Sequence, residues 1–220
     1  MLFDLRGRGR RRTIQGIYLG LAILMGGGLV LFGVGTGVGG GGLLNALTGS
    51  GSGAQKQVIT GAEKQALAAT RQRPTDPSAW SQLIQARWTS AGQGGNFDPS
   101  TLNYTASGKS ELSQLTQDWQ RYLKLTKKPD PSLAILAARA YAQLGEYGGA
   151  ADAWEVQTVA DPTAAKGYEC LAANAYAAKQ TRKGDLAAAK AISLVPKGTG
   201  LSIKQALQQA KTTPQVAQRC

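Results

Sequence analysis

Few residues in this sequence have the chemistry of a catalytic or metal-binding site. None of its 220 residues is His, so the usual general base near neutral pH and the commonest transition-metal ligand are both missing. The tripeptide Gly108-Lys109-Ser110 matches the end of a phosphate-binding loop, but Asn103 stands where that motif needs its first Gly. We interpret the tripeptide as a loop-to-helix junction in which Ser110 is the N-cap. The sequence therefore predicts no catalytic residue, no metal site and no cofactor.

The acidic residues form no pair suited to general acid and base catalysis, because they are scattered singly along the chain. Six of them are expected to lie on solvated helix faces: Glu111, Asp118, Glu146, Asp152, Glu155 and Glu169.

Two cysteines, Cys170 and Cys220, are too few for a four-ligand zinc site. In an oxidising compartment they could form a disulfide that ties the C-terminal tail to the preceding helices. The alternative is two free thiols, and the sequence leaves both open.

The N-terminus has the pattern of a membrane anchor. Residues 14–38 form a stretch of 25 residues without a charge, and about 20 residues of helix cross a hydrocarbon core. Cationic flanks stay on the cytoplasmic side. We therefore predict a single-pass membrane protein with a cytoplasmic N-terminus and an extracytoplasmic C-terminal domain. The cationic flank consists of Arg6, Arg8, Arg10, Arg11 and Arg12.

Two alternatives to an uncleaved anchor follow from the same residues. A cleaved signal peptide would have an apolar core of about 7–15 residues, which is shorter than this one. Nucleic-acid binding by the Arg cluster would require that residues 14–38 are not inserted in a membrane, so we expect no nucleic-acid partner.

Glycines are frequent in and after this stretch. Gly16 and Gly20, and likewise Gly33 and Gly37, have the small-xxx-small spacing that lets membrane helices approach closely. They could support a homo-oligomer, although a Gly-rich segment also produces such pairs by chance. Residues 39–53 are rich in Gly and Ser and predict a flexible linker.

The rest of the chain has helical periodicity, which is clearest in the middle. Apolar residues recur at intervals of three and four from Leu133 to Leu144, and Gly145 ends this stripe. A second stripe starts at Tyr147 and is closed by Pro162. Two helices joined by a tight turn are therefore expected.

This helical hairpin, at 131–162, is repeated. Its segment "AARAYA" at 137–142 returns as "AANAYA" at 172–177, which is 35 residues later. The pattern that begins at Gly145 returns at Gly184, 39 residues later. We therefore expect about four extra residues, near "KQTRKG", to lengthen the second turn.

Looser copies of the hairpin flank these two. "TGAEKQALAATRQRP" predicts a half-unit helix, and "DPSAWSQLIQARW" pairs with a helix at 111–125 across a polar insertion at 92–109. "GLSIKQALQQAK" predicts a polar capping helix. The expected organisation is a basic cytoplasmic segment at 1–13, a transmembrane helix at 14–38, a linker at 39–53, a helical repeat domain at 54–212 and a tail at 213–220.

Helix pairs that recur at about 34 residues resemble the tetratricopeptide repeat (TPR), over about half of this chain. Gly145 suits the tight turn of a TPR unit, and Ala150 suits the close contact between its two helices. Gln157 departs from the TPR pattern, which prefers a small residue at that position. The resemblance is carried by Tyr141, Gly145, Tyr147, Ala150, Trp154 and Pro162. The expected fold is thus all-α: an N-terminal transmembrane helix followed by a TPR-like helical solenoid.

The family resemblance also implies a function. TPR domains bind peptides or helices in a groove lined by the first helix of each pair. The groove residues implied here are Gln85, Trp88, Arg139 and Asn174. The chain is similar to single-span bacterial proteins in which such repeats assist the secretion translocon or envelope assembly. We expect a membrane-anchored scaffold that binds a protein or peptide partner outside the cytoplasm. The alternative is an exported enzyme or ligand-binding domain that uses the insertion at 92–109.

Overall fold

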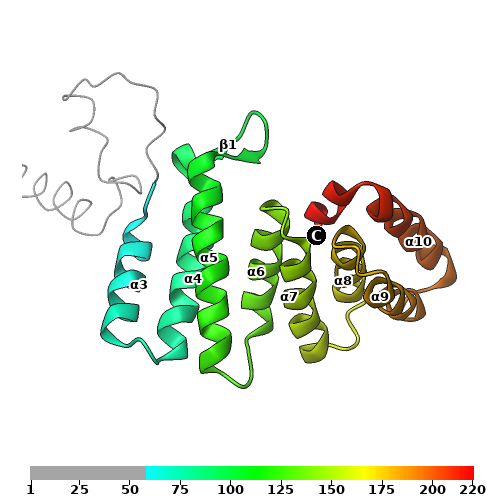
Figure 1. The fold of residues 1–220 in the computed structure, drawn as a ribbon, viewed down its shortest axis with the longest axis horizontal. Coiled ribbons are helices and arrows are strands. Elements are labelled where there is room, and N and C mark those ends of the chain that lie inside the picture. The colour runs from blue at the N-terminus through cyan, green and yellow to red at the C-terminus, as the bar shows by residue number, and fades with distance from the viewer. Residues whose placement is uncertain (1–57) are drawn as a thin grey trace, which may run out of the picture. The chain divides into compact units, whose positions relative to one another are not determined.

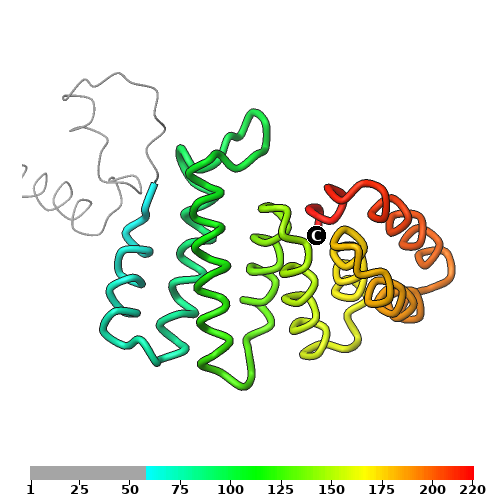
Figure 2. The backbone as a smooth tube through the Cα atoms, viewed as in Figure 1, coloured from blue at the N-terminus to red at the C-terminus, as the bar shows by residue number. Residues whose placement is uncertain are grey.

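The computed structural model describes residues 58–220, and this part of the chain is all-α apart from one short hairpin, as the sequence predicts. Neighbouring helices from α3 to α7 stand side by side and run antiparallel, and α10 and η2 pack on α8 (Figures 1 and 2). The strands pair antiparallel. The elements are α3 (Gly61–Gln72), α4 (Pro77–Ala91), the 3-10 helix η1 (Gly94–Asn96), β1 (Phe97–Asp98), β2 (Asn103–Tyr104), α5 (Ala106–Leu125), α6 (Pro131–Gln143), α7 (Tyr147–Ala160), α8 (Ala165–Ala177), α9 (Thr181–Ser193), α10 (Lys197–Thr212) and the 3-10 helix η2 (Pro214–Arg219).

The predicted basic segment, the membrane span, the whole linker at 39–53 and the first four residues of the predicted repeat domain lie outside the described residues. Within residues 58–220, no helix has both the length and the apolar character that crossing a membrane requires.

Side-chain caps fix where several helices begin. Asp76 and Asp130 each accept a hydrogen bond from the backbone N–H two residues later, and each is followed by a Pro that suits the first helical position. In α5 the cap is Thr105, whose Oγ1 accepts from the N–H of Gly108 at 3.3 Å. The prediction that Ser110 is the N-cap is therefore wrong, because Ser110 lies inside this helix.

The turn between α6 and α7 and the turn between α8 and α9 have the same length and geometry. Each contains three residues, 144–146 and 178–180. Each contains a residue in the left-handed region, Gly145 at φ 79° and Lys179 at φ 61°. The expectation of a longer second turn near "KQTRKG" is therefore wrong, because Lys179 takes the position that Gly145 has in the first turn.

Gly184 has a different role, which it shares with Gly149. A Cβ on Gly149 would lie 2.8 Å from the ring of Tyr141, and a Cβ on Gly184 would lie 2.5 Å from the ring of Tyr176. In both helix pairs the Tyr of the first helix thus packs directly on a Gly of the second helix. These glycines, together with the fully buried Ala150, allow the close approach of the helices.

Two adjacent glycines of α7 allow a test of this packing. Gly149→Ala is expected to lower the free energy of unfolding by about 1–3 kcal/mol, because Tyr141 must move. Gly148→Ala is expected to raise it by up to about 1 kcal/mol, because the added methyl meets only the Gln180 amide at 3.7 Å and Ala favours helix. Urea denaturation of both variants measures the difference, and equal effects would contradict the close contact.

Gly167 accommodates Gln157, which stands where the TPR pattern prefers a small residue. This side chain is 92% buried, since only 8% of the residue is exposed. Its Oε1 occupies the space that a Cβ on Gly167 of α8 would need. The contact between α7 and α8 therefore combines a large residue on one helix with the smallest residue on the other.

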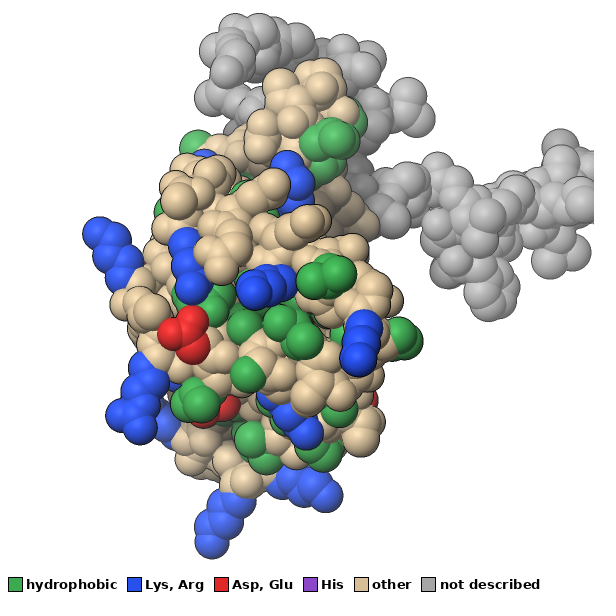
Figure 3. Space-filling view, turned by 90° about the vertical axis from the view of Figure 1, so that its right-hand side faces the viewer, with side chains coloured by type: hydrophobic (Ala, Val, Ile, Leu, Met, Phe, Trp, Pro, Cys, Tyr) green, Lys and Arg blue, Asp and Glu red, His purple; other side chains and the backbone are tan. Residues whose placement is uncertain are grey.

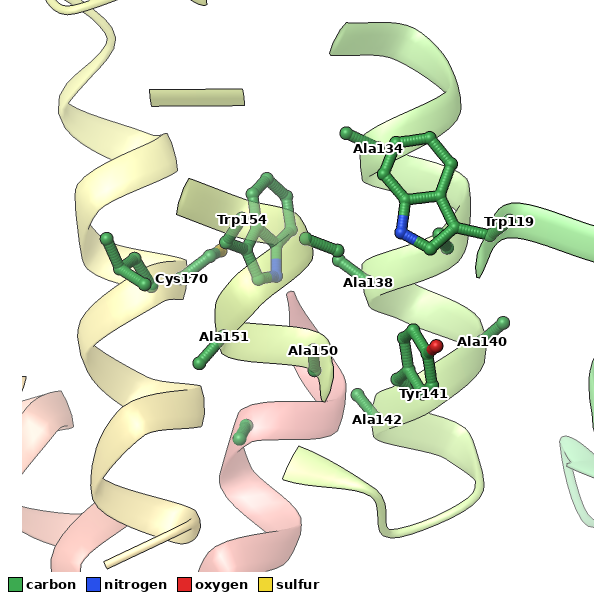
Figure 4. Packing of buried hydrophobic residues seen from close by; sticks show 14 of the residues in the cluster. Trp119, Ala134, Ala138, Ala140, Tyr141, Ala142, Ala150, Ala151, Trp154 and Cys170 are labelled. Carbon is green, nitrogen blue, oxygen red and sulfur yellow. The ribbon is translucent and has the colours of Figure 1, made fainter. Parts of the chain in front are cut away.

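The core consists of aromatic rings set among alanines. Trp119 of α5 stacks on Tyr122 with ring centroids 5.5 Å apart. Figure 4 shows Trp154 of α7 between α6, which carries Ala138, and α8, which carries Cys170. All five of these residues are at least 95% buried, so small and large side chains interlock through the stack.

Buried charges join α3, α4 and α5. Arg87 of α4 donates from Nε to Asp118 at 2.7 Å and from Nη1 to Glu63 at 3.2 Å, to Glu111 at 3.0 Å and to Gln114 at 2.7 Å. Arg87 and the three carboxylates are each at most 6% exposed. The prediction that Glu111 and Asp118 lie on solvated faces is therefore wrong, because both face Arg87.

Three carboxyl groups around one guanidinium leave an excess of negative charge in a buried place. Burial raises the pKa of Glu63, and the neighbouring Glu111 raises it further. Burial also raises the pKa of Asp118 against the lowering effect of Arg87. The folded state therefore holds a proton on this cluster at a higher pH than the unfolded chain does.

This linkage predicts that the domain becomes more stable as the pH falls. A raised carboxyl pKa favours folding below the folded-state pKa, so the free energy of unfolding should increase as the pH falls through the folded-state pKa of the cluster towards the ordinary pKa of a carboxyl group. Glu63→Gln should flatten this dependence and raise stability at neutral pH. Urea denaturation at several pH values measures it. A stability of the wild type that falls over this range, with no effect of Glu63→Gln, would contradict the assignment.

Candidate peptide-binding surfaces

The four residues implied as a groove have different environments. Gln85 is exposed beside a cavity of about 400 Å³ between α3 and α4. Trp88 is half-buried against the core, and Arg139 of α6 is exposed. Asn174 of α8 is completely buried and donates to the carbonyl of Cys170 at 2.9 Å. It therefore does not contribute to an open groove in this structure.

A segment of the chain itself occupies the side of α6 and α8 that carries Arg139 and Cys170. The 3-10 helix η2 packs on α8, α6 and α10. Arg139 donates from Nε to the main-chain oxygen of Cys220 at 3.0 Å, and Gln143 donates to the carbonyl of Gln218 at 3.5 Å. Ala217 is completely buried under these contacts. We call residues 214–220 the covering segment.

A disulfide holds the covering segment in place. Cys170 and Cys220 are bonded, their Cα atoms are 5.5 Å apart, and 50 positions separate them in the sequence. Cys170 is fully buried, whereas Cys220 is partly exposed. The bond thus closes a loop that contains part of α8 and all of α9 and α10.

Apolar hollows flank α7 elsewhere on the domain. One has a volume of about 700 Å³ between α7, α8 and α9, and the other has about 660 Å³ beside the connection from α5 to α6. Val159 and Glu155 line both hollows. Val159 is 78% exposed and Leu186, in the first hollow, is 67% exposed. We call the two hollows together the α7 surface. The α7 surface was not predicted from the sequence. Its signal was two large apolar residues, Val159 and Leu186, at otherwise polar helix positions.

Charged groups stand around the α7 surface. Lys183 binds Asp152 at 2.8 Å and Glu155 at 2.9 Å, and its hydrogen bond to Asp152 raises the pKa of its ammonium group. Arg182 lines the hollow between α7, α8 and α9, and Lys127 lines the hollow beside the connection from α5 to α6. Both residues are exposed. The rim of the surface is therefore polar and mostly basic.

Positive charge is concentrated at the C-terminal end of the described domain. Residues 58–162 contain ten Lys or Arg and ten acids, whereas residues 163–220 contain nine Lys or Arg and two acids. The net charges are therefore 0 and +7. Figure 3 shows this end, where basic side chains outnumber acidic ones.

The insertion at 92–109 has structural contacts. Asn96 is completely buried and donates to the carbonyls of Val58 at 2.9 Å and Ser90 at 2.8 Å. Asp98 accepts from Ser100 and Thr101, and the bond from Ser100 lowers the pKa of its carboxyl group. Across residues 58–220, no group of three or more acidic or Cys side chains is arranged to hold a metal ion.

No protein-family model, curated protein or solved structure matches the chain.

Proposed function

We propose that the protein is a membrane-anchored, TPR-like interaction module whose helical domain lies outside the cytoplasm and binds a protein partner. The uncharged stretch at 14–38, which follows five arginines, supports the anchor and its orientation. The tight turns at Gly145 and Lys179, 34 residues apart, support a TPR-like repeat.

The α7 surface is the observation that carries the binding role. It exposes Val159 and Leu186 beside Pro162 and is bordered by polar and basic groups. An apolar centre with a polar rim is typical of protein interfaces. The partner that fits is a protein segment with apolar side chains and acidic residues at its edges, because Lys127 and Arg182 stand at the rim. Anchoring the domain would raise its local concentration, so a weak contact could suffice.

Site-specific crosslinking in intact cells tests this role. A photoreactive residue at Val159 of the full chain should give a discrete protein adduct, which Leu186→Lys should abolish. The matched control is the same photoreactive residue at Leu201, which is 65% exposed on α10 but lies away from the hollows. Equal adducts from Val159 and Leu201, or none from Val159, would overturn the proposal.

The bridged cysteines allow a test of the topology. A membrane-impermeant maleimide should label intact cells only after an impermeant reductant has opened the Cys170–Cys220 disulfide. Labelling that requires cell lysis, with reductant present in both samples, would contradict an extracytoplasmic domain. Protease digestion of a tag fused after Cys220 provides the control, because it reports orientation without a thiol.

A further inference from the structure

The covering segment contacts the domain as a bound peptide would. Its main-chain oxygens, at Cys220 and Gln218, accept from Arg139 and Gln143, which belong to α6. Ala217 is fully buried and Val216 packs against the core. The amide of Gln218 also approaches the hydroxyl of Tyr147 at 3.5 Å. These are contacts to main-chain groups and to small apolar side chains, which many peptides can make.

These contacts alone are too few to order the segment. Val216 is only partly buried and Ala217 is small, so the segment removes little apolar surface from water. Against this gain stands the conformational entropy lost when seven residues become ordered. The disulfide makes up the difference, because it keeps the segment at its site at a high effective concentration.

We propose that the surface of α6 and α8 beneath residues 214–220 is a second peptide-binding site, and that the covering segment is its built-in occupant. Reduction of the Cys170–Cys220 disulfide exposes the site. The ligand is a short peptide that resembles the covering segment, with small apolar residues such as Val-Ala and free backbone carbonyls. This site is separate from the α7 surface, so each can fail without the other.

The releasing step is a thiol–disulfide exchange with a dithiol reductant. One thiolate of the reductant attacks a sulfur of the bridge and forms a mixed disulfide, and the displaced Cys takes a proton. The second thiolate of the reductant then attacks the mixed disulfide and releases the other Cys. Cys170 and Cys220 gain two electrons and two protons, and the reductant becomes a disulfide.

Cys170 provides a direct readout, because it lies buried beneath the covering segment. In the full chain carrying Cys220→Ser, reconstituted in lipid nanodiscs, the Cys170 thiol should react readily with a maleimide. Added peptide Thr-Thr-Pro-Gln-Val-Ala-Gln-Arg-Ser, the sequence of residues 212–219 followed by Ser in place of Cys220, should slow this reaction by about tenfold or more at saturation. The same peptide with Arg in place of its Ala should not slow it.

A second variant removes competition from the chain's own segment. Cys220→Ser combined with Ala217→Arg should expose Cys170 fully, and the wild-type peptide should still protect it. A matched control combines Cys220→Ser with Gln215→Arg, which alters an exposed position and should behave as Cys220→Ser alone. Circular dichroism verifies that each variant is folded.

Two results would overturn the inference. If Cys170 stays unreactive in folded Cys220→Ser without peptide, the segment remains seated without the bridge and reduction does not open the site. If Cys170 reacts in both variants but saturating peptide leaves the rate unchanged, the surface is not a peptide site. Protection by the wild-type peptide and not by the Arg peptide is the supporting result.

Discussion

Replacing Arg87 with Met is expected to lower the free energy of unfolding by about 3–5 kcal/mol. Met retains most of the volume but leaves Glu63, Glu111 and Asp118 buried without their cation. Removing one partner of a buried ion pair has this effect because the remaining charge is neither hydrated nor compensated. Here three carboxyl groups depend on one guanidinium, so the loss should be at the upper end.

Urea denaturation with the matched control Arg73→Met measures this effect. Arg73 binds Asp76 at 2.7 Å between α3 and α4, but its side chain is 55% exposed. Its replacement should therefore cost less than about 1 kcal/mol. Lowering the pH should partly rescue Arg87→Met, because the buried carboxyls can then accept protons. Equal losses in the two variants would mean that the cluster is solvated.

Local sequence patterns predicted the middle of the domain well. The periodicity from Leu133, the stop at Gly145 and the closure at Pro162 predicted a hairpin at 131–162, and α6 and α7 span 131–143 and 147–160. These boundaries depend on turn and cap residues that act within a few positions of the chain. The capping helix expected at "GLSIKQALQQAK" likewise corresponds to α10.

The second helix pair was misaligned because its turn uses an unusual residue. Gly184 looked like the counterpart of Gly145, yet the left-handed position is held by Lys179. A non-Gly residue at positive φ has no clear signature in a single sequence. Gly184 instead faces Tyr176 on α8, a contact that only tertiary packing produces.

Long-range pairings accounted for the other differences. Glu111 and Asp118 lie 24 and 31 positions from Arg87, so nothing local distinguishes them from solvated acids. The covering segment was equally hidden, because its buried residues are small and its contacts reach back 75 to 81 positions to α6. Cys220 was the one signal, and the sequence left its pairing open.

Loss of the disulfide is expected to destabilise the C-terminal helices by about 2–4 kcal/mol. Closing a loop of about 50 residues restricts the unfolded chain, and the loop-entropy estimate for this length is about 4 kcal/mol. In a stack where each unit contacts only its neighbours, the loss should remain near the bridge. Hydrogen exchange in α8, α9 and α10 should therefore accelerate by about 30- to 1,000-fold in Cys220→Ser, while α3 to α5 keep their protection.

Reductant separates this effect from incidental damage by the substitution. It should accelerate exchange in the wild-type chain to the level of Cys220→Ser and leave Cys220→Ser unchanged. A uniform acceleration from α3 to α10 would show that the domain unfolds as one cooperative unit, and the local argument would fail. Unchanged exchange in α8 to α10 would instead mean that the bridge adds nothing to packing that already holds these helices.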